Sequence, residues 1–204
     1  MSRFTGPRVK KMRALGVNLP GLSRKSMERR PYPPGDHGQN RRRRVSDYGR
    51  QLIEKQKLRF NYGLNERQLR NLFKEAKASK MATGSKLAEL LERRLDNVVF
   101  RAGFASTIPG ARQLVCHGHL MVNGRKVDIP SYRVRTGDVI EPREKSRNLK
   151  AIEGSLDSFG LARPEWLKVN EKAKQAQVSM LPTEESIPFP VELPQVVEAY
   201  NKIL

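Results

Sequence analysis

The first 45 residues of this 204-residue chain carry an excess of positive charge that argues against a conventional core. They hold thirteen Lys or Arg residues against two Asp or Glu, a net charge of +11, together with five Pro and five Gly. Such a segment buries too little apolar surface to offset the entropy lost when it orders. We predict a basic arm, disordered in the free protein, that orders along the phosphates of a nucleic acid. The alternative is a solvated tail.

The remaining charge is weaker and unevenly spread. Of the total of +19, residues 46–92 carry +4, residues 93–165 carry +5 and residues 166–204 carry −1. Aromatic residues make up only 6%, so the cores should be small and built on Leu, Val and Ile. The single cysteine excludes an internal disulfide and favours a reducing compartment. We find no apolar run near the roughly 20 residues of a membrane helix and no secretory signal, which predicts a soluble intracellular protein.

Apolar residues recur at helical spacing through much of the chain, and a side chain able to cap a helix precedes several of these stretches. The predicted helices are 47–60 after Ser46, one after Asn65, a continuous run 87–101, a short one after Ser106 or Thr107, 148–159, and a last one opened by Pro194. The last helix carries an apolar stripe of Val196, Val197 and Tyr200 that must be buried against something.

Beyond Gly118 the apolar period shifts toward two, which is typical of strands. An Asn-Gly pair at 123–124 lies between two such runs and is a strong hairpin signal. The further predicted strands are 132–135, 138–141, 166–169 and 177–181. We therefore predict an α+β protein: an extended basic arm (1–45), a helical domain (46–92 with about 182–204), and a small α/β module (93–181) in which two helices pack on short antiparallel strands.

Catalytic motifs are scarce, since neither a phosphate-binding loop nor a nucleophile elbow is present. The cluster Cys116-His117-Gly118-His119 offers three potential metal ligands but lacks a second Cys pair or a His pair to complete a zinc site. We interpret it as the polar turn between a helix and a hairpin. His37 stands alone in a basic loop, where an RNA contact is a better interpretation than a metal ligand.

Basic residues carry the predicted chemistry. Arg94 and Arg101 are seven residues apart, so on a continuous helix they share a face that points away from the apolar residues. Arg112 comes early in the next helix, whose amino-terminal N–H groups also favour phosphate. With Arg125 and Lys126 on the hairpin, these residues predict a compact cationic surface. The alternative is a set of scattered charges that serve solubility.

Several stretches resemble known sequences. Leu91–Ala105, Thr107–Val115 and His117–Gly124 resemble the RNA-binding module named after the fourth small-subunit ribosomal protein, which also occurs in some pseudouridine synthases and tyrosyl-tRNA synthetases. The upstream segments resemble the bacterial or plastid family of that ribosomal protein itself. These segments are Arg3–Pro7, Pro33–Gly38, Arg44–Gly49, Leu52–Arg59 and Tyr62–Arg70.

The resemblance implies a protein that binds small-subunit ribosomal RNA at a multi-helix junction in the subunit body, early in assembly. It implies contact with the fifth small-subunit protein, at an interface associated with decoding accuracy, and a position near the channel through which mRNA enters. It also implies that the terminal helix returns to the helical domain. Some relatives bind zinc through cysteines in the arm, but this arm has none, so we expect neither metal nor cofactor.

We predict a non-enzymatic, ribosome-bound protein that recognises RNA shape and phosphates, because A-form grooves hide base edges from side chains. With few aromatics among the charges, base stacking should be secondary. The predicted RNA-binding residues are Arg3, Arg8, Lys10, Lys11, Arg13, Arg24, Lys25, His37, Arg41, Arg42, Arg43, Arg44, Arg50, Lys55, Lys57, Arg59, Arg67, Arg70, Arg94, Arg101, Arg112, Arg125 and Lys126.

Two other functions compete with this one. An RNA-modifying enzyme needs a catalytic domain of at least ~100 residues, and the two small domains leave no room for it. An RNA chaperone that acts off the ribosome fits the same composition, and co-sedimentation with ribosomal subunits would separate the two. The sequence leaves open whether the compartment is the bacterial cytoplasm or an organelle, and whether the protein regulates its own message.

Overall fold

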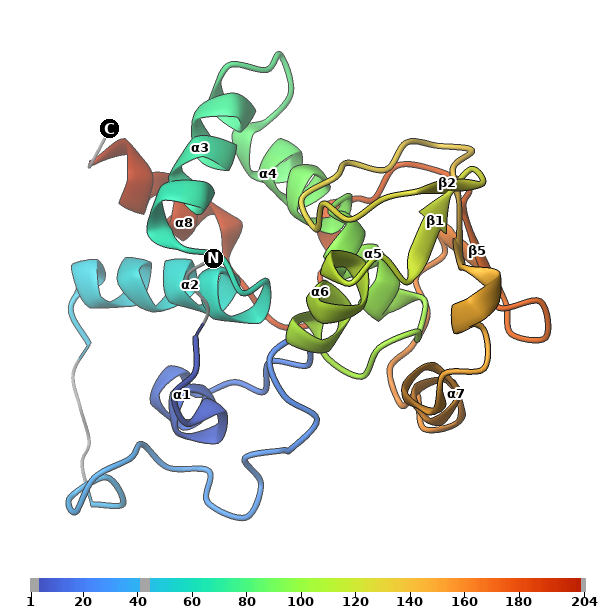
Figure 1. The fold of residues 1–204 in the computed structure, drawn as a ribbon. Coiled ribbons are helices and arrows are strands. Elements are labelled where there is room, and N and C mark those ends of the chain that lie inside the picture. The colour runs from blue at the N-terminus through green and yellow to red at the C-terminus, as the bar shows by residue number, and fades with distance from the viewer. Residues whose placement is uncertain (1–3, 41–44, 203–204) are drawn as a thin grey trace. The chain divides into compact units, whose positions relative to one another are not determined.

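The computed structural model describes residues 4–40 and 45–202 as helices together with one antiparallel sheet, which confirms the α+β class (Figure 1). The α-helices are α1 (Arg8–Leu15), α2 (Asp47–Asn61), α3 (Glu66–Lys77), α4 (Thr83–Glu92), α5 (Leu95–Arg101), α6 (Ile108–Cys116), α7 (Lys150–Asp157) and α8 (Leu193–Asn201). The strands are β1 (Leu120–Val122), β2 (Arg125–Lys126), β3 (Val139–Pro142), β4 (Leu167–Asn170) and β5 (Gln175–Val178), and the short 3-10 helices are η1 (Glu144–Ser146) and η2 (Glu184–Ser186). Of the helices in these residues, none is long and apolar enough to cross a membrane.

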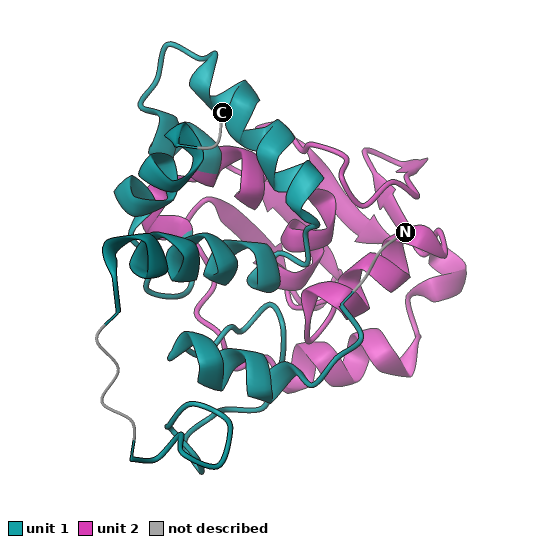
Figure 2. Cartoon of the chain, turned by 90° about the vertical axis from the view of Figure 1, so that its left-hand side faces the viewer, with its two compact units in different colours: residues 1–87, 187–204 teal, residues 88–186 magenta. Residues whose placement is uncertain are grey.

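The chain forms two compact units (Figure 2). Unit 1 combines residues 1–87 with 187–204, and unit 2 is the intervening segment 88–186. The end of the chain thus belongs to the same unit as its beginning. The predicted three-part division at residues 45, 92 and 181 stays a prediction.

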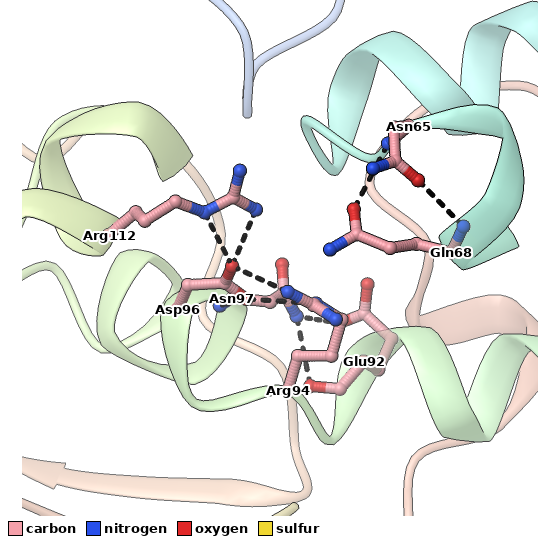
Figure 3. Close-up of polar contacts among 7 residues, drawn as sticks. All are labelled: Asn65, Gln68, Glu92, Arg94, Asp96, Asn97 and Arg112. Carbon is pink, nitrogen blue, oxygen red and sulfur yellow. Dashed lines mark hydrogen bonds and ion pairs between the residues drawn. The ribbon is translucent and has the colours of Figure 1, made fainter. Parts of the chain in front are cut away.

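Local capping explains where the helices of unit 1 begin. Ser46 Oγ accepts a hydrogen bond from Gly49 N at 3.2 Å at the start of α2. At the start of α3, Asn65 Oδ1 accepts from Gln68 N at 2.7 Å while Asn65 N donates to Gln68 Oε1 at 3.1 Å (Figure 3). This reciprocal pair satisfies two N–H groups that a helix terminus otherwise leaves unpaired. Both predicted caps are confirmed.

Helix α8 completes the core of unit 1. Its Tyr200 is fully buried and stacks on Phe73 of α3, with ring centroids 4.7 Å apart. The Tyr200 hydroxyl donates to Glu66 Oε1 at 3.1 Å, and Gln51 of α2 donates to Glu198 at 2.8 Å. The apolar stripe predicted for this helix is therefore buried among the helices of residues 47–77, although Val197 is only half-buried.

The amino-terminal segment differs from its prediction. Residues 8–15 form a helix, and Met12, Leu19 and Leu22 are buried. Gly21 N donates to Oδ1 of Asn61, at the end of α2, at 2.9 Å. The disorder predicted for the arm in the free protein is not what the structure shows for residues 8–22, because their few apolar side chains are buried within unit 1.

Replacing Asn61 with alanine should weaken the attachment of Gly21 to α2. The change leaves the Gly21 N–H without its acceptor in a buried position, which costs about 1–3 kcal/mol. Amide exchange of residues 16–23 in the free protein should accelerate accordingly. Asn201→Ala, which removes only an exposed contact with Lys77, is the matched control. Rapid exchange of Gly21 in the unaltered protein would instead support the disordered arm.

The predicted continuous helix over 87–101 is wrong, because it breaks after Glu92. Leu95 N donates to Tyr132 O at 2.8 Å and Asp96 N donates to Pro130 O at 3.1 Å. These carbonyls replace the acceptors that a continuous helix would supply. The chain around these carbonyls also differs from its prediction. Instead of the predicted strand over 132–135, it forms only an isolated bridge between Arg133 and Arg94.

The sheet of unit 2 is antiparallel in the order β2-β1-β3-β5-β4. The predicted hairpin joins β1 and β2, with Val122 opposite Arg125. Its two turn residues have positive φ, 50° for Asn123 and 73° for Gly124. This backbone is what a type I′ turn requires, and Asn-Gly is the pair best suited to it.

Candidate nucleic-acid interface

One buried carboxylate binds two of the arginines predicted to contact RNA (Figure 3). Asp96, in the first turn of α5, is 1% exposed. It accepts from Arg94 Nε at 3.1 Å and Nη2 at 2.9 Å, and from Arg112 Nε at 3.1 Å and Nη2 at 2.7 Å. Arg94 is itself buried, and the side chain of Arg112 is 17% exposed. One negative charge thus holds two positive charges at the junction of α5 and α6.

A second buried acid lies at the end of α4. Glu92 Oε2 accepts from Asn97 Nδ2 at 3.1 Å and lies 3.7 Å from Arg101 Nε. Arg101 is 4% exposed, and its Nη2 donates to Ser186 O at 3.0 Å. The predicted exposed face shared by Arg94 and Arg101 is therefore wrong, because the break after Glu92 turns both guanidinium groups inward onto acids.

A sequence signal for this arrangement existed. Asp96 and Glu92 lie among the apolar residues predicted to form a core, such as Leu91, Leu95 and Val98, in a stretch that also holds Arg93, Arg94 and Arg101. A charged side chain in such a stretch needs a partner, because an unpaired buried charge is very costly. The helical periodicity alone gave no reason to pair these acids with neighbouring arginines.

Two lysines of α2 are also committed to packing. Lys55 is buried and pairs with Glu66 at 2.9 Å, while its ammonium lies 5.4 Å from the Tyr200 ring centroid. Lys57 pairs with Glu54 at 2.6 Å and donates to Pro190 O at 3.3 Å. Both predicted RNA contacts thus hold the carboxy-terminal segment in unit 1.

Two arginines of α1 organise the segment that follows them. Arg8 Nη1 donates to Leu22 O at 3.3 Å. Arg13 donates to Tyr32 O at 2.9 Å and to Pro33 O at 3.3 Å, and its guanidinium lies 4.9 Å from the Tyr32 ring centroid. These side chains satisfy carbonyls of an irregular loop that has few backbone partners, so their role in the structure is to shape the loop.

The other predicted basic residues keep much of their charge uncompensated. Lys10, Arg24, Lys25, Arg67 and Arg125 are exposed, and His37 is exposed in its loop. Within residues 4–40 and 45–202, none of those five makes an ion pair. Arg50 is exposed but pairs with Asp47 at 2.6 Å, and Lys126 lies 3.6 Å from Asp128. Arg3 and Arg41–Arg44 lie outside the described residues.

Three further predicted cations lie near aromatic side chains of unit 1. The Lys11 ammonium lies 5.3 Å and the Arg59 guanidinium 5.5 Å from the ring centroid of Phe60. Arg70, like Arg59, lies close enough to Tyr200 to act on its hydroxyl electrostatically. In the described part of the chain, Lys11, Arg59 and Arg70 form no ion pair. Each of the three is half-buried and keeps its positive charge on unit 1.

Sequence reasoning missed one cation beside the hairpin. Asn123 Nδ2 donates to Asp138 Oδ1 at 2.8 Å, and Arg135 N donates to Asp138 Oδ2 at 2.7 Å. Asp138 therefore joins the hairpin turn to the loop that carries Arg135, whose side chain is exposed as that of Arg125 is. Only the tertiary hydrogen bonds of Asp138 reveal that these two arginines belong to neighbouring segments.

The Cys-His cluster does not resemble a metal site. Across the described residues, no three His, Cys, Asp or Glu side chains lie close enough together to hold an ion. Cys116 is a half-buried free thiol, and the Nδ1 atom of His119 is hydrogen-bonded with Ser146 Oγ at 2.9 Å. The expected absence of a metal stays a prediction.

Comparison with known proteins finds similarity along nearly the whole chain. Residues 3–92 match the ribosomal protein S4/S9 N-terminal domain and residues 93–140 match the S4 domain. The chain is 59% identical over 201 residues to small ribosomal subunit protein uS4 of Methylobacillus flagellatus and to uS4B of Nitrosomonas europaea, spanning 98% of this chain and of each relative. It is 49% identical over 203 residues to uS4 of Chlorobaculum tepidum, spanning 99% of this chain and 100% of that relative. Matches of this identity along nearly the full length of the chain place it in the family of small ribosomal subunit protein uS4.

Proposed function

We propose that this protein is a structural, non-enzymatic component of the small ribosomal subunit that binds small-subunit ribosomal RNA directly at a multi-helix junction. The observation that carries the proposal is the separation of its basic residues into two classes. One class is buried on acids and fixes the fold, and the other is exposed without a counter-charge. A folded surface with uncompensated cations suits the phosphates of structured RNA.

The finer parts of the proposal follow from the family. Binding early in assembly would nucleate the body of the subunit, and contact with the fifth small-subunit protein would link this chain to translational accuracy. A position near the channel through which mRNA enters is part of the same proposal. The full-length similarity to proteins named small ribosomal subunit protein uS4 supports the place in the small subunit from which these three proposals start.

Alanine at Lys10, Arg24 and Lys25 together should weaken RNA binding mainly through counterion release. Removing one phosphate contact should flatten the slope of log K against log salt by roughly 0.7–0.9, with little change in which RNA is preferred. The measurement is the affinity of the full chain for a small-subunit rRNA junction and for a plain duplex of equal length, at several salt concentrations.

The control is Arg163→Ala, since Arg163 already pairs with Glu171 and is not among the proposed contacts. It should leave the salt slope unchanged. The proposed function would be contradicted if the unaltered protein bound the duplex as tightly as the junction at every salt concentration. A triple variant with an unchanged slope would remove these three residues from the interface.

A further inference from the structure

One face of helix α6 is buried and the opposite face borders a surface pocket. Its inner face is buried in the core of unit 2 through Ile108 and Val115. Its outer face, with Gln113 and His117, lines a surface pocket of about 310 Å³. The pocket is bounded on its other sides by the turn after α5 and by the start of α7. It lies within unit 2 and includes none of the arginines bound to Asp96 or Glu92.

Both apolar and polar side chains line this pocket. Leu114 and Leu149 supply an apolar surface, while Ser106 and Gln113 supply hydrogen-bonding groups; Phe104 also borders the pocket but is fully buried. No acidic side chain lines the pocket. A flat apolar group with polar atoms on its edge would match both parts of this lining.

Two histidines stand at one side of the pocket. The rings of His117 and His119 have centroids 5.9 Å apart and planes inclined by 56°. The hydrogen bond between His119 Nδ1 and Ser146 Oγ, 2.9 Å long, fixes the His119 ring against η1, where Ser146 is buried. His117 is exposed and leaves a ring face for another planar group.

Positive charge lies next to this side. Arg143 Nη1 donates to the carbonyl of Gly118, the residue between the two histidines, at 3.4 Å. The stem of Lys126 crosses Gly118 so closely that a Cβ added there would lie 2.4 Å from Lys126 Cε, and the positive φ of 68° also suits a glycine. Both cations are exposed, and Asp128 lies 3.6 Å from the Lys126 ammonium without enclosing it.

We infer that this pocket takes a single unpaired RNA base, with its phosphate toward Lys126 and Arg143. The inference rests on the proposed function and adds a base-reading site to a surface otherwise built for phosphates. Unpaired bases in RNA loops and bulges stack on aromatic side chains, histidine included, and use their edges for hydrogen bonds. A volume near the lower end of ligand pockets, which start at about 300 Å³, suits one nucleotide better than a larger group.

An apolar side chain of a neighbouring protein is the other conceivable occupant. It would leave the Gln113 amide, the Ser106 hydroxyl and the histidine edges without partners, and it would gain nothing from the adjacent cations. A nucleotide satisfies the polar edge and the positive charge together. The charge and the mixed lining therefore favour RNA.

The test uses the full chain and a transcript of small-subunit rRNA. His117→Ala removes the stacking ring, and Gly110→Leu fills the pocket from α6 without removing a polar group. Gln177→Ala, at an exposed position of β5 in the same unit and outside the pocket lining, is the control. We expect each pocket variant to bind about tenfold more weakly, as for the loss of one stacked base, and the control to bind normally.

Dimethyl sulfate probing of the rRNA then identifies the base. One unpaired nucleotide should be protected in the complex with the unaltered protein and exposed with His117→Ala, while the remaining footprint is unchanged. On a transcript that lacks this base, His117→Ala should cost no further affinity.

The outcomes separate the two claims. If the unaltered protein shows no preference for the rRNA, the proposed function fails. If it does, but both pocket variants bind and footprint as it does, the base pocket is wrong and the function stands. Particles can also be reconstituted with the pocket variants. If these particles lack another small-subunit protein while the variants bind RNA normally, the pocket binds a protein and the inference is overturned.

Discussion

Replacing Asp96 with alanine is expected to lower the free energy of unfolding by about 3–5 kcal/mol, the usual cost of removing one partner from a buried ion pair. The carboxylate neutralises Arg94 and holds Arg112, and it also accepts from Asn97 N at 3.0 Å. Without it the guanidinium of Arg94 stays buried with no counter-charge. The junction of α5 and α6 should then open.

The single tryptophan makes this measurable. Trp166 is buried in unit 2, so denaturant unfolding followed by its fluorescence reports on the unit that contains Asp96. Asp128→Ala in the same unit is the control, because its pair with Lys126 is exposed and should contribute no more than about 1 kcal/mol. Equal midpoints for the two variants would show that the Asp96 pairs contribute little to stability. Any loss of RNA binding by Asp96→Ala should follow the loss of folding.

Replacing Tyr200 with alanine should destabilise unit 1 by about 3–5 kcal/mol, as removal of a large buried aromatic ring does. The ring is fully buried, stacks on Phe73 and is approached by the ammonium of Lys55. Its loss leaves α8 without its main anchor. Thermal unfolding followed by helical circular dichroism should show the lower stability, and α8 should lose protection in amide exchange. Unchanged protection of α8 would contradict this role.

Tyr200→Phe is the matched control and separates the ring from its hydroxyl. It should cost only about 0.5–1.5 kcal/mol, the net value of one hydrogen bond. Burial, reinforced by the nearby Glu66, raises the pKa of the Tyr200 hydroxyl above its ordinary value. The unfolded chain therefore releases this proton first as pH rises above about 10, and stability falls. Tyr200→Phe should lack that part of the alkaline loss.

Local sequence determined the elements and their boundaries where a side chain acts on its own backbone. Ser46 and Asn65 cap α2 and α3, and Asn123-Gly124 makes the hairpin turn, because each uses atoms within a few residues of itself. The sequence motifs also pointed to the uS4 family, since the order of the matching segments does not depend on how the chain packs. The excess of positive charge near the amino terminus is likewise a property of the sequence alone.

Tertiary structure decided which basic residues are free. Arg94 and Arg101 looked equivalent to Arg67 and Arg125 in the sequence, yet the first two are buried on Asp96 and Glu92 while the other two remain exposed. The break of the helix after Glu92 depends on carbonyls about 35 residues away, and Gly21 is held by Asn61 of α2, 40 residues away. No local pattern encodes such partners, because ion pairing and burial are set by the groups that folding brings together.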